Sequence, residues 1–405
     1  MEKIKLSNGL SVANAGRAKE FSVCLSINVG HVNEPSLGLA ALFERVLLMQ
    51  IKGFLPVFGG TMTAYTASGY DLGDILKKIV KIFDSSLITP ESIDLAKQAI
   101  HRQTYDLSQL TMRRARLLYK HVAFGADLVR STEEYLASVD SYTVEDVINF
   151  GKEYYNAQNA VLVIAGPEPW DEVKLIASEI MSSVPEGKAH PLIKEDIYTG
   201  GIGRININNK NDNNIRIMLG WNLRHLTIHD SHVANVLMSM LARRLERAYY
   251  EAGIQDVSVE VKVAGYYGLR TLRIGVISQQ ASPKKLTAIC INAINRICDT
   301  EANEERMEKS RNAAMTEKLD KWERSDDRAL EMAWQLIGRG SMYDVCSRIN
   351  LISETTANDV MMLAREIFRK SRPTFISVVY DTSFIYKYRE LLERLKIPHM
   401  LKDDE

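Results

Sequence analysis

The sequence predicts an α+β fold made of two similar halves, in each of which a mixed, mostly antiparallel sheet is covered by helices. Three observations support this fold class. With 405 residues, of which 46% are hydrophobic, the chain is long enough for two domains with sizeable cores. Segments of strand-like alternation and of helical periodicity follow one another in both halves. One stretch near the end of the first half recurs near the end of the chain.

Two predicted strands open the first half. KIKLSNGLSVANA, from Lys3, alternates around Asn8-Gly9, the residue pair preferred in a two-residue type I′ hairpin turn. FSVCLSINVG, from Phe21, alternates in the same way. Apolar residues at helical spacing then predict helices over 38–49, 72–87 and 89–108, the last with Thr89 as its cap and Pro90 in its first turn.

An internal repeat links the two halves. TVEDVINFGKEYYNAQNAVLVIAG, from Thr143, aligns without a gap to TANDVMMLAREIFRKSRPTFISVV, from Thr356, which is an offset of 213 residues. Both copies predict a capped helix that runs into an apolar strand. Two copies of one fold are therefore expected, rather than two unrelated domains.

The second half is predicted to repeat the order of the first. Its elements are strands at 202–208 and 214–221, a long helix ending at Gly253, strands at 257–265 and 269–278, and helices at 283–298 and 302–322. We therefore predict an N-terminal domain at 1–183, a linker at 184–200, the C-terminal repeat at 201–385 and a helical tail at 386–405.

Charge and cysteine content restrict the class of function. Lys plus Arg and Asp plus Glu each number 51, so no excess charge would attract nucleic acid or an anionic membrane. The four cysteines fit no zinc or disulfide spacing, and no apolar run reaches the roughly 18 residues of a membrane span. The N-terminus lacks the pattern of a secretory signal. We predict a cytoplasmic protein that binds no nucleic acid and has no membrane span.

A series of short patterns, in a fixed order, covers residues 1 to about 380. They are L-x-N-G-L-x-V at 6–12, a glycine and a glutamate at Gly30 and Glu34, GLAALFER at 38–45, G-G-x-x-x-A-x-T at 59–66, and Y-x-x-x-N-x-V-L-V-I-A-G at 155–166. In this order they resemble the insulinase or pitrilysin-like zinc peptidases, the inverzincins, which include the mitochondrial processing peptidase. The resemblance implies a fold that forms one half of a clamshell.

The same resemblance places the family's zinc motif, H-x-x-E-H, on ALFER. In that motif the two histidines bind zinc and the glutamate activates a water molecule. Here Ala41 and Arg45 stand at the histidine positions, Glu44 keeps the position of the base, and Gln103 falls on the third ligand, a glutamate in the family. Alanine has no donor atom and a guanidinium is a permanent cation. We predict no catalytic residue, no metal site and no cofactor in this chain.

The family's substrate-gripping arginine and tyrosine are also missing. With the glycine of R-L-F-Q-E-V-R-E-K-R-G-L-A-Y placed on Gly253, the arginine falls on Tyr249 and the tyrosine on Asp256. Arg243 and Arg247 lie on the same predicted helix and could replace part of the grip. The candidates for peptide binding are therefore Arg45, Arg243, Arg247 and Tyr249.

Each candidate also has a purely structural interpretation. Glu44 is expected to be a partly buried carboxylate paired with a cation, rather than a surviving base. Arg45 either contacts a substrate carbonyl or carboxylate, or forms an ion pair. Arg243 and Arg247 equally fit a solvated helix face. The histidines of WNLRHLTIHDSH are expected to lie on a surface loop rather than to bind a metal.

These observations predict a protein that is not an enzyme by itself. We expect a non-catalytic subunit of a zinc-dependent peptidase complex, which binds or positions a peptide while an active homologous subunit, carrying the zinc, hydrolyses it. The assembly would be a heterodimer, or else a homodimer. The alternatives are a stand-alone peptide-binding or scaffold protein and a hydrolase that uses another metal site or a ligand supplied in trans.

Overall fold

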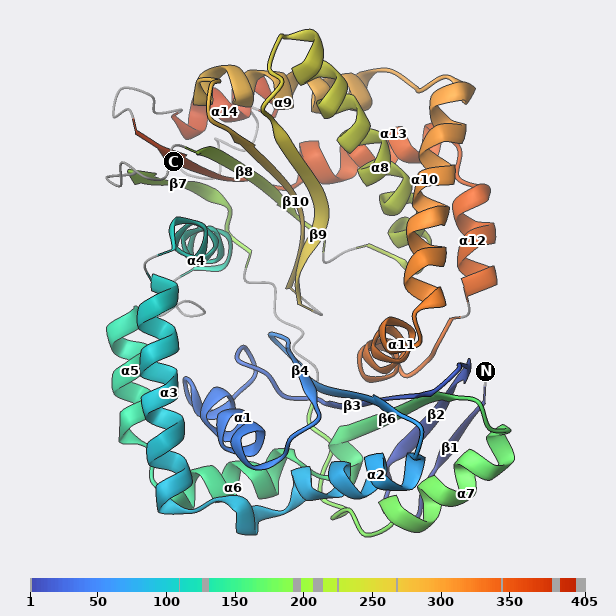
Figure 1. Ribbon diagram of the computed structural model, residues 1–405. Coiled ribbons are helices and arrows are strands. Elements are labelled where there is room, and N and C mark those ends of the chain that lie inside the picture. Colours follow the sequence, from blue (N-terminus) through green and yellow to red (C-terminus); the bar gives the residue numbers. More distant parts are fainter. Residues whose placement is uncertain are drawn as a thin grey trace. The chain divides into compact units, whose positions relative to one another are not determined.

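The computed structural model describes residues 2–108, 110–125, 131–191, 198–206, 214–223, 226–266, 269–343, 345–380 and 387–397. The chain divides into two compact units of about equal size. Unit 1 comprises residues 1–106, 130–194 and 319–345, and unit 2 comprises residues 107–129, 195–318 and 346–405. Each unit contains one sheet (Figure 1).

The sheet of unit 1 has the strand order β1-β2-β6-β3-β5-β4. β2 and β6 are parallel, and all other neighbours are antiparallel. The strands are β1 (Lys3–Lys5), β2 (Ser11–Arg17), β3 (Phe21–Ile27), β4 (Leu55–Phe58), β5 (Thr63–Gly69) and β6 (Ala160–Gly166).

The sheet of unit 2 has the order β7-β11-β8-β10-β9, with β7 and β11 parallel and the other neighbours antiparallel. Its strands are β7 (Gly201–Asn206), β8 (Ile215–Asn222), β9 (Ser258–Tyr266), β10 (Leu269–Ser278) and β11 (Thr374–Val379). This order reproduces β2-β6-β3-β5-β4, with the parallel pair in the same place. The predicted fold class, two similar halves with mixed, mostly antiparallel sheets, is confirmed.

Several helices cover one face of each sheet. In unit 1 these are α1 (Leu39–Gln50), α2 (Leu72–Val80), α6 (Val144–Tyr154) and α7 (Trp170–Met181), with α3 (Pro90–Ser108) and α5 (Thr132–Ser141) beside them (Figure 1). In unit 2 they include α8 (Ile228–Glu251), α9 (Pro283–Asp299) and α13 (Ala357–Lys370), and α10 (Glu304–Glu323), α12 (Val345–Ser353) and α14 (Tyr388–Arg394) complete the set. Each group buries one large apolar core against its sheet.

The predicted repeat is visible in the helix caps. Thr143 and Asp146 form a capping box at the start of α6, and Thr356 and Asp359 form the same box at the start of α13. Such a box satisfies backbone N–H groups that the first turn leaves without partners. Both helices then run into fully buried strands, β6 and β11.

A helix from the other repeat covers the second face of each sheet. α11 (Ser325–Arg339) packs on β3 and β6 of unit 1, and α4 (Thr111–Phe124) packs on β7 and β11 of unit 2 (Figure 1). The offset of 213 residues places 111–124 on 324–337, so the two helices are equivalent members of the repeat. The units therefore exchange one helix each, which the predicted boundaries at 183 and 201 did not anticipate.

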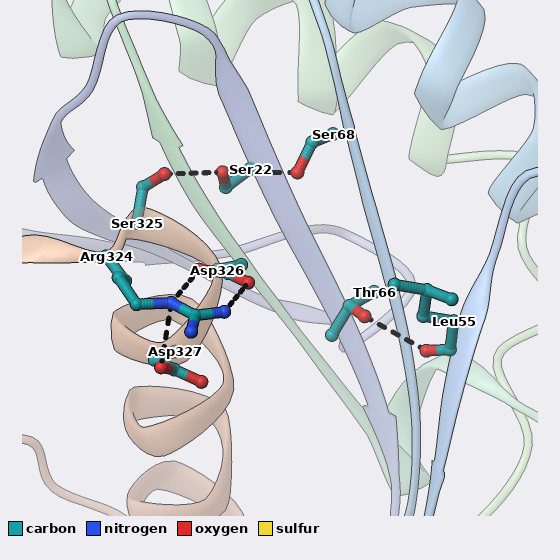
Figure 2. Close-up of polar contacts among 8 residues, drawn as sticks. All are labelled: Ser22, Leu55, Thr66, Ser68, Arg324, Ser325, Asp326 and Asp327. Atoms are coloured by element: carbon teal, nitrogen blue, oxygen red, sulfur yellow. Dashed lines mark hydrogen bonds and ion pairs between the residues drawn. The ribbon is translucent and has the colours of Figure 1, made fainter. Parts of the chain in front are cut away.

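Small side chains allow these exchanged helices to lie close to the strands. On α11 the buried residues are Ala329, Met332, Ala333 and Leu336, and on α4 they are Ala115, Tyr119 and Ala123. Polar bonds fix both helices. The buried guanidinium of Arg328 donates to the carbonyl oxygen of Arg17 at 2.8 Å, and the hydroxyl of Tyr119 donates to Thr271 at 2.9 Å. Ser325 lies 2.7 Å from Ser22 of β3 (Figure 2).

Two local expectations were wrong. The N-terminal turn is not a two-residue type I′ turn: Leu6 bonds to Leu10, and Gly9 takes φ +90° while Asn8 is not left-handed. This is a three-residue loop, in which one glycine supplies the positive φ. The helix expected over 72–87 ends at Val80 and continues as two 3₁₀ turns, Lys81–Phe83 and Ser85–Leu87.

Gly220 offers a direct test of the packing of α4. A Cβ added there would lie 1.8 Å from the Tyr119 hydroxyl, whereas one added at Gly275 of β10 meets nothing closer than 3.9 Å. We expect Gly220→Ala to lower the free energy of unfolding by about 3 kcal/mol, because overpacking must displace the helix. Urea denaturation should show this loss, with Gly275→Ala as the matched control. Equal stability of the two variants would contradict the close packing of α4.

Candidate functional site

The helix that carries the degenerate motif, α1, begins at a glycine in the left-handed conformation. Gly38 takes φ +85°, and it has no side chain with which to cap the helix. Instead, the carboxylate of Glu34 accepts hydrogen bonds from the N–H groups of Gly38 and Ala40, both at 2.7 Å. Burial raises the pKa of Glu34 to about 7, against the lowering effect of these two bonds. Glu34 is therefore the N-terminal cap of α1.

Apolar contacts fix the rotation of α1. Leu42, Phe43, Val46 and Leu47 are buried in the core of unit 1. The ring of Phe43 lies 5.4 Å from that of Phe150 and 4.4 Å from that of Tyr155, measured between ring centroids. Gly151 of α6 leaves room for this ring, since a Cβ there would be 2.5 Å from Phe43. The remaining face of the helix presents Ala41 and Arg45, one turn apart.

The structure brings Arg45 and Gln103 together. Gln103 lies on α3, and its side-chain oxygen accepts a hydrogen bond from the guanidinium of Arg45. The three positions that would hold zinc ligands, Ala41, Arg45 and Gln103, thus lie within one region of unit 1. Gln103 reaches this region although it is 58 residues from Arg45 in sequence. Where two zinc ligands would stand, this site has a hydrogen bond from the Arg45 guanidinium to the Gln103 amide oxygen.

Glu44 lies on the buried side of α1, with 9% of its surface exposed. Burial raises its pKa to about 8, and the positive charge of Arg45 offsets only part of that effect. The hydroxyls of Tyr65 and Tyr155 are 2.9 Å apart, and the Glu44 charge contributes to raising the pKa of both. Burial is the main cause for all three groups. At neutral pH the Glu44 carboxyl is mostly protonated, so it can donate a hydrogen bond.

The residues at the ligand positions do not suit zinc. Ala41 offers no donor atom, Arg45 would repel the ion, and the oxygen of Gln103 is engaged by Arg45. Within the described residues, no group of three or more His, Cys, Asp or Glu side chains could hold a metal ion. The histidine pair of the predicted loop, His229 and His232, lies on α8, and His225 falls outside the described residues.

The candidates of unit 2 have two different environments. Tyr249 is fully buried, and its hydroxyl donates to the carbonyl oxygen of Leu286 at 2.8 Å. Its prediction as a peptide-binding residue was therefore wrong, because no peptide atom can reach it in the folded unit. Arg243 and Arg247 are exposed on α8, where Arg247 pairs with Glu251 at 2.7 Å.

Asp256, at the family's tyrosine position, has a structural role. Its carboxylate accepts hydrogen bonds from the N–H groups of Gln279 and Gln280 and from the hydroxyl of Ser278. The bond from Gln279 is the main cause that holds the pKa of Asp256 below its usual range. This aspartate therefore organises the turn after β10. The sequence had given no sign of it, or of the Tyr65–Tyr155 pair, because their partners are distant along the chain.

Comparison with known families bears on this site. Residues 141–314 match the family model described as the peptidase M16 inactive domain. This part of the chain is therefore similar to the peptidase M16 inactive domain. This confirms the resemblance drawn from the sequence patterns, since the M16 peptidases are the insulinase and pitrilysin-like family. The matched M16 range excludes α1 and α3, so the loss of the zinc ligands rests on Ala41, Arg45 and Gln103 themselves.

Solved structures share the fold of this chain over nearly its whole length. A chain of complex III2 from Candida albicans, with Inz-5 bound, is 17% identical with a TM-score of 0.84, covering 97% of this chain and 99% of that chain. A protease from Helicobacter pylori is 13% identical, with a TM-score of 0.77 and coverages of 93% and 98%. A peptidase M16 inactive domain from Pseudomonas fluorescens is 13% identical, with a TM-score of 0.80 and coverages of 95% and 99%.

One further property concerns membranes. In the part of the chain that the structure describes, none of the helices combines the length and the apolar character needed to cross a bilayer.

Restoring the ligands would test whether α1 and α3 still form the M16 zinc scaffold. We expect the triple variant Ala41→His, Arg45→His, Gln103→Glu to retain one zinc ion per chain after dialysis, because it places two imidazoles one helical turn apart and a carboxylate beside the second. The double variant without Gln103→Glu should bind zinc at least about tenfold more weakly. A folded triple variant without stoichiometric zinc would show that these residues do not converge.

The pKa of Glu44 predicts how stability depends on pH. Between its ordinary value of 4.5 and about 8, the folded chain holds a proton that the unfolded chain releases, so this group lowers stability as pH rises through that range. We expect Glu44→Gln to match the native chain near pH 4.5 and to exceed it by about 1–3 kcal/mol at pH 9. Calorimetry at both pH values would measure this, with the exposed Glu393→Gln as control. A difference that does not change with pH would contradict the assignment.

Proposed function

We propose that this chain is a non-catalytic subunit of a zinc-dependent peptidase complex, in which it binds or positions a peptide for an active homologous subunit. The observation that supports this most directly is the state of α1. Its cap and its apolar contacts hold a fixed helix, while Ala41, Arg45 and Gln103 provide no zinc site. The match to an inactive M16 domain agrees with a chain that lacks hydrolytic activity of its own.

Arg45 is the residue of unit 1 best suited to contact a peptide. It is partly exposed, and a guanidinium has five N–H donors in a fixed plane. The bond to Gln103 orients this plane and leaves donors that suit a peptide carbonyl or carboxylate. In unit 2, taken by itself, the peptide-binding candidates are the exposed side chains of Arg243 and Arg247, and Arg247 would exchange its ion pair with Glu251 for a peptide group. We place the complex in the cytoplasm.

A scaffold role is the second candidate, and one observation favours it. The chain of complex III2 shares the fold over 97% of this chain, and that chain belongs to a larger complex. By analogy, this chain would stabilise an assembly through its surface without holding an unfolded peptide. Arg45 would then serve only to satisfy Gln103.

Co-expression with an active M16 peptidase of the same organism would distinguish the two roles. If the proposal holds, the two chains co-elute on size exclusion, and the mixture cleaves an unstructured peptide at least about tenfold faster than the active chain alone. Arg45→Gln should lower this gain without dissolving the complex, because it removes a peptide contact and keeps the helix. Absence of a complex, together with no gain in cleavage, would leave the scaffold role.

A further inference from the structure

The sheet of unit 2 ends in a long edge strand. β9 is the outermost strand, and it pairs with β10 over all nine of its residues (Figure 1). In the part of the chain that the structure describes, the backbone of residues 258–264 forms hydrogen bonds only with β10. The outer side of the strand therefore presents a row of N–H and C=O groups with which another strand can pair.

The equivalent edge of unit 1 is poorly suited to such pairing. β4 has only four residues, and one of them, Pro56, has no N–H group to donate. The carbonyl oxygen of Leu55 already accepts a hydrogen bond from the hydroxyl of Thr66 at 2.9 Å (Figure 2). β9 is more than twice as long and contains no proline. Of the two equivalent edges, β9 is the one that can extend its sheet.

The side chains of β9 divide between the two faces of the sheet. Val259 and Val261 pack against the main core of unit 2, and Val263 follows on the same face with 40% of its surface exposed. Glu260 and Lys262 alternate with these valines, so they lie on the opposite face. Their side chains are 51% and 41% exposed, and they pair with each other along the strand. Both charges are thus accessible from the edge.

This sequence is complementary to itself in one antiparallel register. If two copies of β9 pair with Val261 opposite Val261, then Glu260 of each copy is opposite Lys262 of the other, and Val259 is opposite Val263. Opposite charges and β-branched residues directly across an antiparallel ladder stabilise it. Centring the pair on Glu260 or on Lys262 would instead place two like charges opposite each other. A shift by one residue would bring charges opposite valines. The charges therefore favour a single register.

The neighbouring strand adds a reason for this pairing. Lys262 lies directly opposite Arg273 of β10, which is an unfavourable pair of like charges. Glu260 pairs with both cations, and it lies 3.5 Å from the guanidinium of Arg273. The side chain of Arg273 is only 11% exposed, so solvent screens its charge poorly. A second copy would bring another carboxylate to Lys262, on the side away from Arg273.

We propose that β9 pairs with β9 of a second copy of this chain, antiparallel and centred on Val261, so that two unit 2 sheets form one continuous sheet. A lone lysine on an edge strand opposes such pairing, but Glu260 supplies the complementary charge two residues away. The pairing also covers the exposed Val263 with a valine of the other copy. It goes beyond the proposed function, because it requires neither a peptide nor an active subunit.

Reversal of either charge on the full chain would test the pairing. Sedimentation between about 1 and 100 µM should show the native chain in a monomer–dimer equilibrium. Glu260→Lys and Lys262→Glu each place like charges opposite each other at two positions, so each should raise the dissociation constant at least about tenfold. Arg389→Glu is the matched control: it makes the same charge change as Lys262→Glu on α14, where Arg389 is 77% exposed, and it should leave the dimer unchanged.

A mixture of the two charge variants distinguishes pairing from damage to the fold. Glu260→Lys has two positive charges on this face of β9, and Lys262→Glu has two negative charges. When the two chains pair in the proposed register, unlike charges again face each other at both positions. The mixture should therefore form a heterodimer with about the native affinity, although neither variant dimerises well alone. A folding defect could not produce this recovery.

Several outcomes would overturn the proposal. They are a native chain that stays monomeric at about 100 µM, a dimer that neither charge variant weakens, and a mixture that associates no better than the separate variants. None of these results affects the proposed peptidase role, because that role is tested by co-elution and cleavage with an active subunit.

Discussion

Each sheet of this protein has two apolar faces, and both must be kept from water. A layer of several helices covers one face, but the opposite face is covered by a single helix whose small residues allow it to lie close to the strands. That contact sets the rest of the architecture. Gly220 makes room for Tyr119, and Arg328 reaches the end of β2, so each exchanged helix is fixed in position as well as buried.

On α1 the residues that hold the helix differ from those that would hold a metal. Phe43 and Leu47 face the core, and Glu34 closes the first turn, whereas Ala41 and Arg45 occupy the other face. Zinc ligands can therefore be lost without loss of the fold. In a site without zinc, the polar side chains at the ligand positions would have no partners, which costs free energy. The hydrogen bond between Arg45 and Gln103 removes that cost. Glu44 avoids the free-energy cost of a buried charge in another way, because its raised pKa keeps the carboxyl protonated and neutral.

Features that depend on residues close together in the sequence could be predicted, whereas features that depend on distant residues could not. The capping boxes at Thr143 and Thr356, the strand periods and the position of α1 depend on near neighbours, and these expectations agree with the structure. The exchange of α4 and α11 depends on packing between segments hundreds of residues apart, which no local pattern reveals. Tyr249 was misjudged because a motif position gives no information on burial.

The exchange of helices also constrains the order of events during synthesis. The sheet of unit 1 is assembled from strands that all precede residue 167, yet its second face stays open until α11, ending at Arg339, has been made. The first repeat therefore leaves the ribosome with an uncovered apolar surface and waits for more than 150 further residues, the distance from Gly166 to Arg339. Because β11 of unit 2 ends at Val379, such a chain completes both units almost together near the end of translation.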